Sequence, residues 1–261
     1  MDKAEGGCTS IGISSDAGKN GDAFLANNWD WKPSQRESMV IMKIRQKTGK
    51  PDIFMVTEAG IIGKTGYNSA GLCLYLNALS TDQAPKGLPL HIAMREILDC
   101  TTLAEAIAAA VRFRLGCCAN FMIGHRNGEC VDIEIENEEF DVLYPKDGIL
   151  VHTNHFISPL LPIRPRQDTC KRKFTDTFVR LGRADKLIRK KGHDISEEDI
   201  MEILRDHVEY PSGICRHEDV NQPEGKRMGT VFSMIVNLTQ GNIYYCKGNP
   251  CEMDYKIYTL S

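Results

Sequence analysis

The sequence has no long apolar run and no surplus of positive charge. Its apolar runs fall short of the ~18–20 residues that a membrane span needs. Lysine and arginine number 32 against 35 aspartate and glutamate, a net charge of -3, whereas binding to nucleic acid or an anionic membrane favours a basic surplus. Residues 1–5 carry charges without the apolar core of a secretory signal. We therefore expect a cytoplasmic protein that binds neither nucleic acid nor membrane.

Disulfide and metal-binding patterns are also missing. Ten cysteines in 261 residues is well below the ~8–10% of a disulfide scaffold, and no two of them form a CxxC pair. The seven histidines include no HxxxH or HExxH spacing. His152 and His155 are close in sequence, but they end a predicted strand instead of sharing a helix face. We expect a reduced protein with no metal and no other cofactor.

What the sequence does contain is a series of short strand patterns interrupted by two pairs of helices. Alternating or buried apolar runs between turn residues predict strands at 11–14, 23–28, 39–45, 53–57, 72–77, 119–125, 130–136, 140–144, 149–153, 230–237, 243–247 and 255–260. Amphipathic spacing and capping residues predict helices at 89–99, 102–115, 169–190 and 196–206. This order predicts an α+β domain of two antiparallel sheets flanked by helices. The basic stretch 171–191 is interpreted as a solvated helix face.

Cys8 is the residue with the clearest chemical meaning. It follows Gly6-Gly7 and opens a strand-like run at 9–13. Cleavage before Cys8 would leave a thiol and an α-amine on one residue. The amine, with a pKa of ~7.7–8.0, can take a proton from a thiol of ~8.5 near working pH. By position alone, an ordinary cysteine near a chain end is the simpler interpretation, and other segments reverse it.

Further polar residues stand at predicted strand ends and turns. They lie in the segments Asn-Trp-Asp-Trp at 28–31, TEAGIIGK at 57–64, 66–71, 77–79, HTNH at 152–155, 210–216 and 225–227. Together with Cys8, these segments closely resemble the acyl-coenzyme A:6-aminopenicillanic acid acyltransferase family, the cysteine branch of the N-terminal nucleophile hydrolases. The resemblance runs from Cys8 to about Asn237. It implies a four-layer αββα fold and a precursor that its own cysteine cuts at the Gly7–Cys8 bond.

The resemblance assigns roles to individual residues. Cys8 matches the nucleophile, and Asp30 matches the aspartate that fixes the α-amine. Asn154 matches an asparagine of the catalytic centre, and Arg227 an arginine near the nucleophile. Asn77 resembles the oxyanion-hole asparagine of the related bile-salt hydrolases. In this scheme the thiolate attacks an amide or thioester carbonyl, Asn77 and Asn154 donate to the oxyanion (~2.7–4 kcal/mol per donor), and water or an amine takes the acyl group.

The sequence departs from the family in two places. Family precursors carry a much longer segment before the cysteine, which becomes a separate α chain. We interpret residues 1–7 as a residual propeptide or linker and residues 8–261 as one domain equivalent to the β chain, with a separate α chain as a candidate partner. Lys226 stands beside Arg227 where the fungal acyltransferase has serine, which argues against penicillin chemistry.

We therefore expect hydrolysis or acyl transfer on a small N-acyl amide or peptide-like amide, with acyl-coenzyme A as a candidate substrate. Because invertebrate relatives hydrolyse β-alanyl amines, that substrate class stays open beside penicillin or isopenicillin N acyl transfer. One alternative is a non-catalytic remnant that binds acyl amides or pairs with another subunit. Another is a papain-like thiol hydrolase that pairs Cys8 with a distant histidine. It is weaker because residues 9–13 are predicted as a strand, not a helix. The oligomeric state is not predicted.

Overall fold

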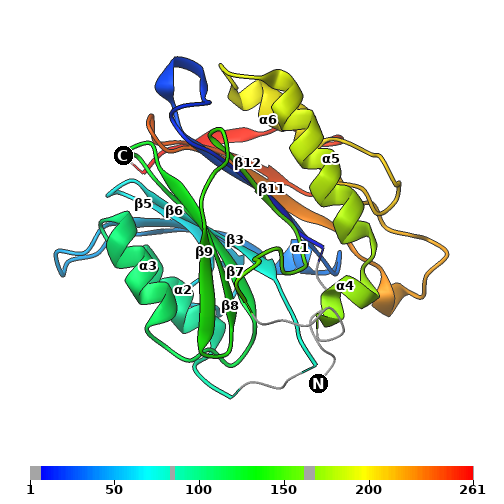
Figure 1. Ribbon diagram of the computed structural model, residues 1–261, viewed down its shortest axis with the longest axis horizontal. Coiled ribbons are helices and arrows are strands. Elements are labelled where there is room, and N and C mark those ends of the chain that lie inside the picture. The colour runs from blue at the N-terminus through cyan, green and yellow to red at the C-terminus, as the bar shows by residue number, and fades with distance from the viewer. Residues whose placement is uncertain (1–6, 83–85, 162–167, 261) are drawn as a thin grey trace.

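The computed structural model describes residues 7–82, 86–161 and 168–260 (Figure 1). Its strands form two antiparallel sheets. The six-stranded sheet has the order β10-β1-β2-β11-β12-β13, and the seven-stranded sheet runs in sequence from β3 to β9. The first comprises β1 (Thr9–Ile13), β2 (Phe24–Trp31), β10 (Ile149–His152), β11 (Gly229–Asn237), β12 (Asn242–Lys247) and β13 (Lys256–Tyr258). The second comprises β3 (Met39–Ile44), β4 (Ile53–Glu58), β5 (Thr65–Asn68), β6 (Leu72–Ala78), β7 (Ala119–His125), β8 (Cys130–Glu136) and β9 (Glu139–Leu143).

Two helix pairs cover the outer faces of these sheets (Figure 1). The pair α2 (Leu90–Leu98) and α3 (Leu103–Val111) packs on the seven-stranded sheet. The pair α5 (Asp176–Lys191) and α6 (Glu197–Leu204) packs on the six-stranded sheet. Shorter helices are α1 (Gln35–Ser38), α4 (Thr169–Lys173) and the 3-10 turns η1 (Lys19–Gly21) and η2 (Glu224–Lys226). The layers are therefore helix, sheet, sheet, helix, as the resemblance implies. No helix within the described ranges is both long and apolar enough for a membrane span.

Three apolar cores hold the layers together. The core between the sheets includes Leu25, Phe54 and Met122, all fully buried. The outer cores bury Ile97 of α2 and Ile188 of α5 against their sheets. Each such side chain stabilises the fold by ~1.5–3 kcal/mol relative to an exposed one. Strand β1 is buried on both faces, so the residues around Cys8 belong to the interior of the molecule.

Most predicted elements are confirmed. The strands at 119–125 and 130–136 are confirmed as β7 and β8, and the capping boxes at Thr102 and Ser196 are both present. The single helix predicted at 169–190 is wrong, because the chain leaves helical geometry at Phe174 (φ -124°, ψ 72°) and divides into α4 and α5. The predicted helix at 102–115 ends earlier, at Val111. Of the predicted propeptide, only Gly7 lies within the described residues.

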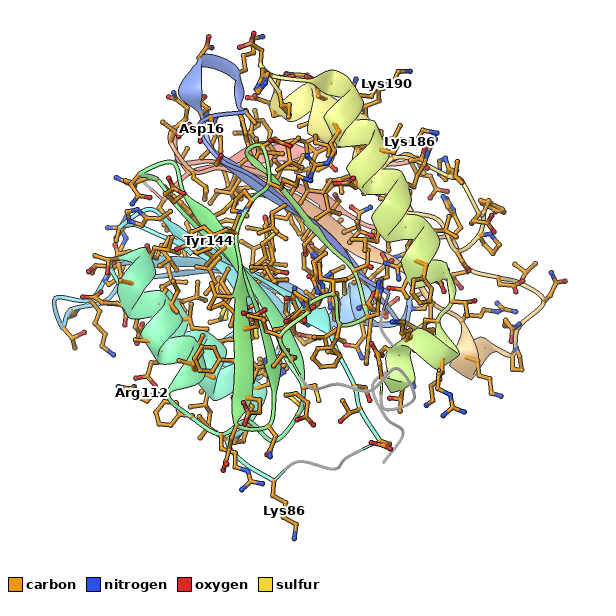
Figure 2. The ribbon with its side chains drawn as sticks, viewed as in Figure 1. Asp16, Lys86, Arg112, Tyr144, Lys186 and Lys190 are labelled. Atoms are coloured by element: carbon orange, nitrogen blue, oxygen red, sulfur yellow. The ribbon has the colours of Figure 1, made fainter. Side chains whose placement is uncertain are left out.

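The basic stretch is only partly the solvated face that the sequence predicts. Lys186 and Lys190 on α5 are exposed and point away from the sheet (Figure 2). Arg180, on the opposite side of the same helix, is 1% exposed. This arginine faces the start of β1, where Cys8 stands.

Candidate active site

Cys8 lies immediately before β1, and its backbone is held on both sides. Its N–H donates to Asn154 Oδ1 at 2.8 Å, and its carbonyl oxygen accepts from Arg180 Nη1 at 2.7 Å. Arg180 Nη2 donates to the same Asn154 Oδ1 at 3.0 Å. The Asn154 amide nitrogen is directed at the carbonyl of Ala78 (3.1 Å). The structure thus brings Cys8 and Asn154 together as predicted, although Asn154 accepts from the nucleophile residue and donates to the backbone.

A set of buried charges surrounds this contact. Asp30 Oδ1 accepts from Thr230 Oγ1 at 2.8 Å, and Asp30 Oδ2 lies 3.4 Å from Arg216 Nε. Arg216 also pairs with Asp176, which accepts from Arg180 Nε at 2.9 Å. Two carboxyl groups face two guanidinium groups, so the charges balance inside the protein when Asp30 is ionised. In the uncleaved chain, the Cys8 amide nitrogen donates to Asn154, and no hydrogen bond joins it to Asp30 within the described residues.

Burial controls the protonation of the two key groups. It raises the pKa of the Asp30 carboxyl to about 7, against the opposing effects of Arg216 and Arg180. It also raises the pKa of the Cys8 thiol to about 11, assisted by the negative charge of Asp30 and opposed by a backbone hydrogen bond with Asp30 and by Arg180 and Lys64. In the uncleaved chain the thiol is therefore protonated at neutral pH and needs a base to react.

A cavity of about 260 Å³ opens at Cys8. Its lining is largely apolar and consists of Cys8, Trp29, Trp31, Glu58, Lys64, Leu76, Ala78, Leu90 and His91. Lys64 Nζ pairs with Glu58 Oε1 at 2.5 Å and lies 3.4 Å from the centroid of the Trp29 ring. Burial lowers the pKa of Lys64, with Glu58 opposing that effect. The nucleophile candidate thus faces an apolar space that contains a buried cation.

The side chain of Asn77 is fully buried and hydrogen-bonded. Its Oδ1 accepts from Ser10 Oγ at 2.6 Å and from Asn120 Nδ2 at 3.3 Å. Its Nδ2 donates to the His152 carbonyl at 3.3 Å. Since its amide donates to the backbone and its side chain contacts β1, Asn77 lies in the contact between the two sheets. It is not among the residues that line the cavity.

The structure does not bring Arg227 to the nucleophile. Arg227 follows η2, is half-buried, and donates to the carbonyls of Gln222 (3.0 Å) and Val220 (3.3 Å) in its own loop. Among the residues that the structure describes, Arg180 and Arg216 are the arginines that reach the Cys8 site. A signal for Arg180 was present in the sequence, because it lies on the α5 face that buries Thr177, Ala184 and Ile188.

The two histidines of the HTNH segment anchor the end of β10. His152 contacts Glu134 Oε1 at 2.8 Å and the Thr153 carbonyl at 2.9 Å, and His155 Nδ1 lies 2.9 Å from Thr177 Oγ1. Burial lowers the pKa of His155 to about 4. No histidine in the described ranges hydrogen-bonds to Cys8, and a strand follows that cysteine. Both observations weigh against the papain-like alternative.

Comparison with known proteins identifies the family to which this chain belongs. The family model described as acyl-coenzyme A:6-aminopenicillanic acid acyl-transferase matches residues 17–252. The acyl-coenzyme A:6-aminopenicillanic-acid-acyltransferase 40 kDa form of Emericella nidulans is 32% identical over 237 residues. That alignment covers 90% of this chain and 62% of the fungal protein, so the chain spans less than two thirds of that relative.

Solved structures agree on the fold. A single-residue variant of the conjugated bile acid hydrolase from Clostridium perfringens matches with a TM-score of 0.65 at 15% identity, over 97% of each chain. The N-acylethanolamine-hydrolyzing acid amidase ortholog of Caenorhabditis elegans matches with a TM-score of 0.62 at 17% identity, over 89% of this chain and 93% of that one. The architecture is that of the N-terminal nucleophile hydrolases. By its sequence, this chain belongs to the acyl-coenzyme A:6-aminopenicillanic acid acyl-transferase family.

Proposed function

We propose that the protein is an amide hydrolase or acyltransferase whose nucleophile is Cys8, exposed as a new N-terminus by cleavage of the Gly7–Cys8 bond. The observation that carries this proposal is the fixed position of Cys8. Asn154 holds its nitrogen, Arg180 holds its carbonyl, and its side chain lines the 260 Å³ cavity. These contacts fix the backbone that carries the thiol, and the cavity beside the thiol has room for a small acyl group.

Cleavage begins when the Cys8 thiolate attacks the carbonyl carbon of Gly7. A C–S bond forms, the C–N bond breaks, and the nitrogen leaves as the α-amine of Cys8. Water then hydrolyses the thioester and releases the preceding segment. Asp30, a buried carboxyl with a pKa of about 7, is the candidate base for the thiol proton. A Cβ at position 7 would lie 2.8 Å from Arg216 Nε, so glycine allows the bond to sit against this cation.

In the processed enzyme the α-amine replaces the amide nitrogen that Asn154 now holds. It takes the thiol proton, and the thiolate attacks the carbonyl of an amide or acyl thioester. The leaving group accepts the proton, and water or an acceptor amine then takes the acyl group from Cys8. The apolar walls and small volume of the cavity suit a small apolar acyl group. Lys64 offers its charge to the polar end of the substrate. Small N-acyl amides fit this site best, and an acyl-coenzyme A donor is the thioester counterpart.

Intact mass and N-terminal sequencing of purified protein test the proposal. Wild type should lose residues 1–7, and Cys8→Ala should keep them. Cys100→Ala, at a half-buried cysteine outside the site, is the matched control and should cleave like wild type. An active wild type that retains residues 1–7 would rule out the N-terminal nucleophile mechanism. A wild type that retains them and turns over no amide or thioester would favour the non-catalytic alternative.

Selective labelling provides a second test of the nucleophile. In processed protein, brief treatment with limiting iodoacetamide should modify Cys8 before the other cysteines, because only Cys8 has an amine base on the same residue. Peptide mapping locates the label. Preferential labelling of Cys170 or Cys251 with Cys8 untouched would contradict the assignment.

A further inference from the structure

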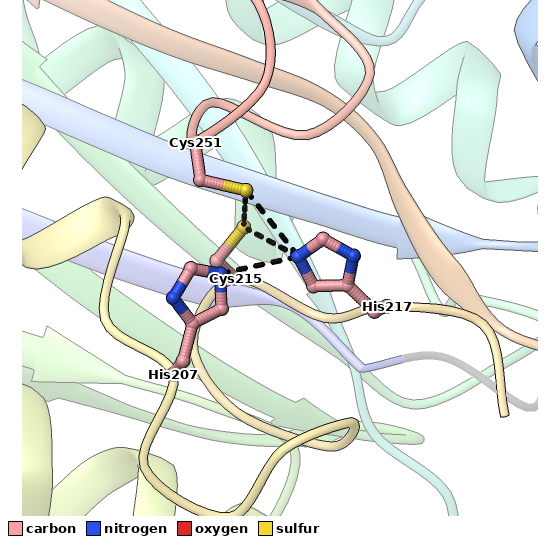
Figure 3. A group of neighbouring side chains, drawn as sticks. All are labelled: His207, Cys215, His217 and Cys251. Atoms are coloured by element: carbon pink, nitrogen blue, oxygen red, sulfur yellow. Dashed lines mark hydrogen bonds between the residues drawn. The ribbon is translucent and has the colours of Figure 1, made fainter.

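A second group of reactive side chains lies outside the Cys8 site. His207 follows α6, Cys215 and His217 lie in the loop that leads to β11, and Cys251 lies in the turn after β12 (Figure 3). Their ligand atoms all lie within 4.8 Å of one another. Figure 3 shows the four side chains converging from separate segments. We refer to them as the Cys2His2 cluster.

Four of the six distances within the cluster lie close to those around a tetrahedral metal ion, and the other two, from His207 to the sulfurs, are no longer than 4.8 Å. The two sulfurs are 3.5 Å apart, and the two Nε2 atoms are 3.1 Å apart. His217 Nε2 lies 3.8 Å from Cys215 Sγ and 3.3 Å from Cys251 Sγ. With Zn–S of ~2.3 Å and Zn–N of ~2.0–2.1 Å, tetrahedral geometry separates ligands by ~3.3–3.8 Å. We propose that His207, Cys215, His217 and Cys251 form a structural Zn²⁺ site.

Hydrogen bonding alone does not account for this convergence. His217 Nε2 faces His207 Nε2 and both sulfurs, yet one ring nitrogen carries at most one proton. A cation at the centre satisfies all four lone pairs together. Binding releases the two thiol protons to solvent, and two thiolates then neutralise the Zn²⁺ charge. Because four protein ligands close the coordination sphere, the ion serves structure, not catalysis.

Neighbouring groups supply the outer contacts that metal-binding histidines and cysteines usually have. Glu252 Oε1 lies 3.6 Å from His217 Nδ1, the ring nitrogen that faces away from the cluster. Asn249 Nδ2 donates toward Cys215 Sγ at 3.5 Å. A carboxylate on this side favours the tautomer with a proton on Nδ1, which presents Nε2 to the metal. Asn249 thus orients Cys215, and Glu252 places a negative charge beside His217.

The cluster is also connected to the Cys8 site. Arg216 stands between Cys215 and His217, and its guanidinium lies 3.4 Å from Asp30. The Arg216 carbonyl accepts from Asn249 Nδ2 at 2.8 Å. A metal that ties this loop to the turn after β12 would therefore hold Arg216 in place. The binding of zinc at this site does not require Cys8 to be a nucleophile.

Metal analysis of the whole protein tests the site without any activity assay. Protein purified under reducing conditions, stripped with a chelator and reconstituted with ZnCl2 should retain one zinc per chain after gel filtration. Cobalt in place of zinc should give the visible bands of a tetrahedral ion and a thiolate charge-transfer band. Cys251→Ser and His207→Gln should each weaken zinc binding beyond the ~10–100-fold that losing an outer-shell partner costs. Cys100→Ser and His193→Gln, outside the cluster, should bind zinc like wild type.

Three results would overturn the proposal. The first is reconstituted wild type that retains no zinc. The second is equal zinc binding by Cys251→Ser and the controls. The third is an intact mass short of two hydrogens, with peptide mapping that joins Cys215 to Cys251, which would identify a disulfide pair. The wild-type measurements stand even if a variant fails to fold, and zinc binding with an uncleaved, inactive chain would separate this site from the proposed function.

Discussion

Two buried polar networks lie close together in this molecule, and they differ in charge and in whether they reach a cavity. The Cys8 network is charged and borders a cavity; it consists of Cys8, Asp30, Asn154, Asp176, Arg180 and Arg216. The inter-sheet network is built of neutral side chains and links β1 and β2 to β6 and β7; it consists of Ser10, Asn27, Asn77 and Asn120, the last of which also interacts with the buried Asp132 carboxyl. Neutral amides that bond to one another stabilise a contact. The charged network reaches the cavity through Cys8, so it can act on the reaction of that thiol.

The free-energy cost of removing one residue also differs between the two networks. Removing one partner of a buried ion pair typically costs 3–5 kcal/mol, roughly, because the other charge is left without compensation. Leaving one buried amide group unsatisfied costs ~1–3 kcal/mol. We therefore expect changes in either network to reduce stability, with the larger losses in the Cys8 network, and only changes in the Cys8 network to reduce activity as well.

The largest effect is expected for Asn154→Ala. This change removes the acceptor that holds the Cys8 nitrogen at 2.8 Å and Arg180 at 3.0 Å. Because a misplacement of ~1 Å can cost ~10²-fold, kcat should fall about a hundredfold or more with little change in KM. Steady-state kinetics on an amide that wild type hydrolyses would measure this. Unchanged kcat with a raised KM would move Asn154 from the catalytic centre to the cavity wall.

The next effect depends on pH and concerns Asp30→Asn. Burial raises the pKa of Asp30 to about 7, so the carboxylate predominates only above that pH. Self-cleavage of wild type should speed up as pH rises from 6 to 8, and the variant should lack this rise and be about a hundredfold slower at pH 8. A time course of intact mass at several pH values gives the rates. An equal pH dependence in both proteins would exclude Asp30 as the base.

The raised pKa of Asp30 also predicts how the stability of the protein changes with pH. The folded state binds the Asp30 proton more tightly than the unfolded chain, so this stabilising contribution is full below pH ~4 and is lost as pH rises through about 7. Thermal unfolding of uncleaved Cys8→Ala protein, with and without Asp30→Asn, isolates the contribution. The second protein should lose less stability between pH 5 and 8.

A smaller effect is expected for Lys64→Met, which removes the buried cation of the cavity. Lys64 contacts Glu58 and the Trp29 ring, not the Cys8 backbone. KM should therefore rise about tenfold, equivalent to ~1.4 kcal/mol of binding, with kcat less affected. Glu58→Gln, which keeps the lysine, is the matched control. A loss of kcat at constant KM would place Lys64 among the groups that stabilise the transition state.

Much of the fold could be predicted from the sequence because turns and capping residues mark its elements. Thr102 and Ser196 cap helices as their sequences indicate. The break at Phe174 had no proline or glycine to signal it, since tertiary packing decides where α4 ends. The site was predictable only in part. Cys8 and Asn154 lie in distinctive segments, whereas Arg180 is one of many basic residues and is distinguished by its buried helix face.

The Cys2His2 cluster marks the limit of what spacing along the chain can predict. Cys215 and His217 are two positions apart, but the two cysteines are 36 positions apart and the two histidines 10, so the sequence shows one pair of neighbouring ligands and no complete metal-binding pattern. Only the packing of the turn after β12 against the loop before β11 brings the four side chains together. The Arg227 prediction was limited for a similar reason, because adjacent basic residues in one loop do not reveal which of them points inward.

The smallest effect on activity is expected for Asn77→Ala, and this variant tests the comparison most directly. Asn77 accepts from Ser10 and Asn120 across the sheets, and its amide donates to the His152 carbonyl. Its loss should cost ~1–3 kcal/mol of stability and leave kcat within about twofold of wild type. Asn120→Ala, in the same network without a predicted catalytic role, is the control and should resemble it in urea unfolding. If Asn77→Ala instead lowers kcat about a hundredfold while Asn120→Ala does not, the oxyanion role expected from the resemblance holds. The two networks would then share a catalytic residue, and the neutral one could no longer be regarded as structural alone.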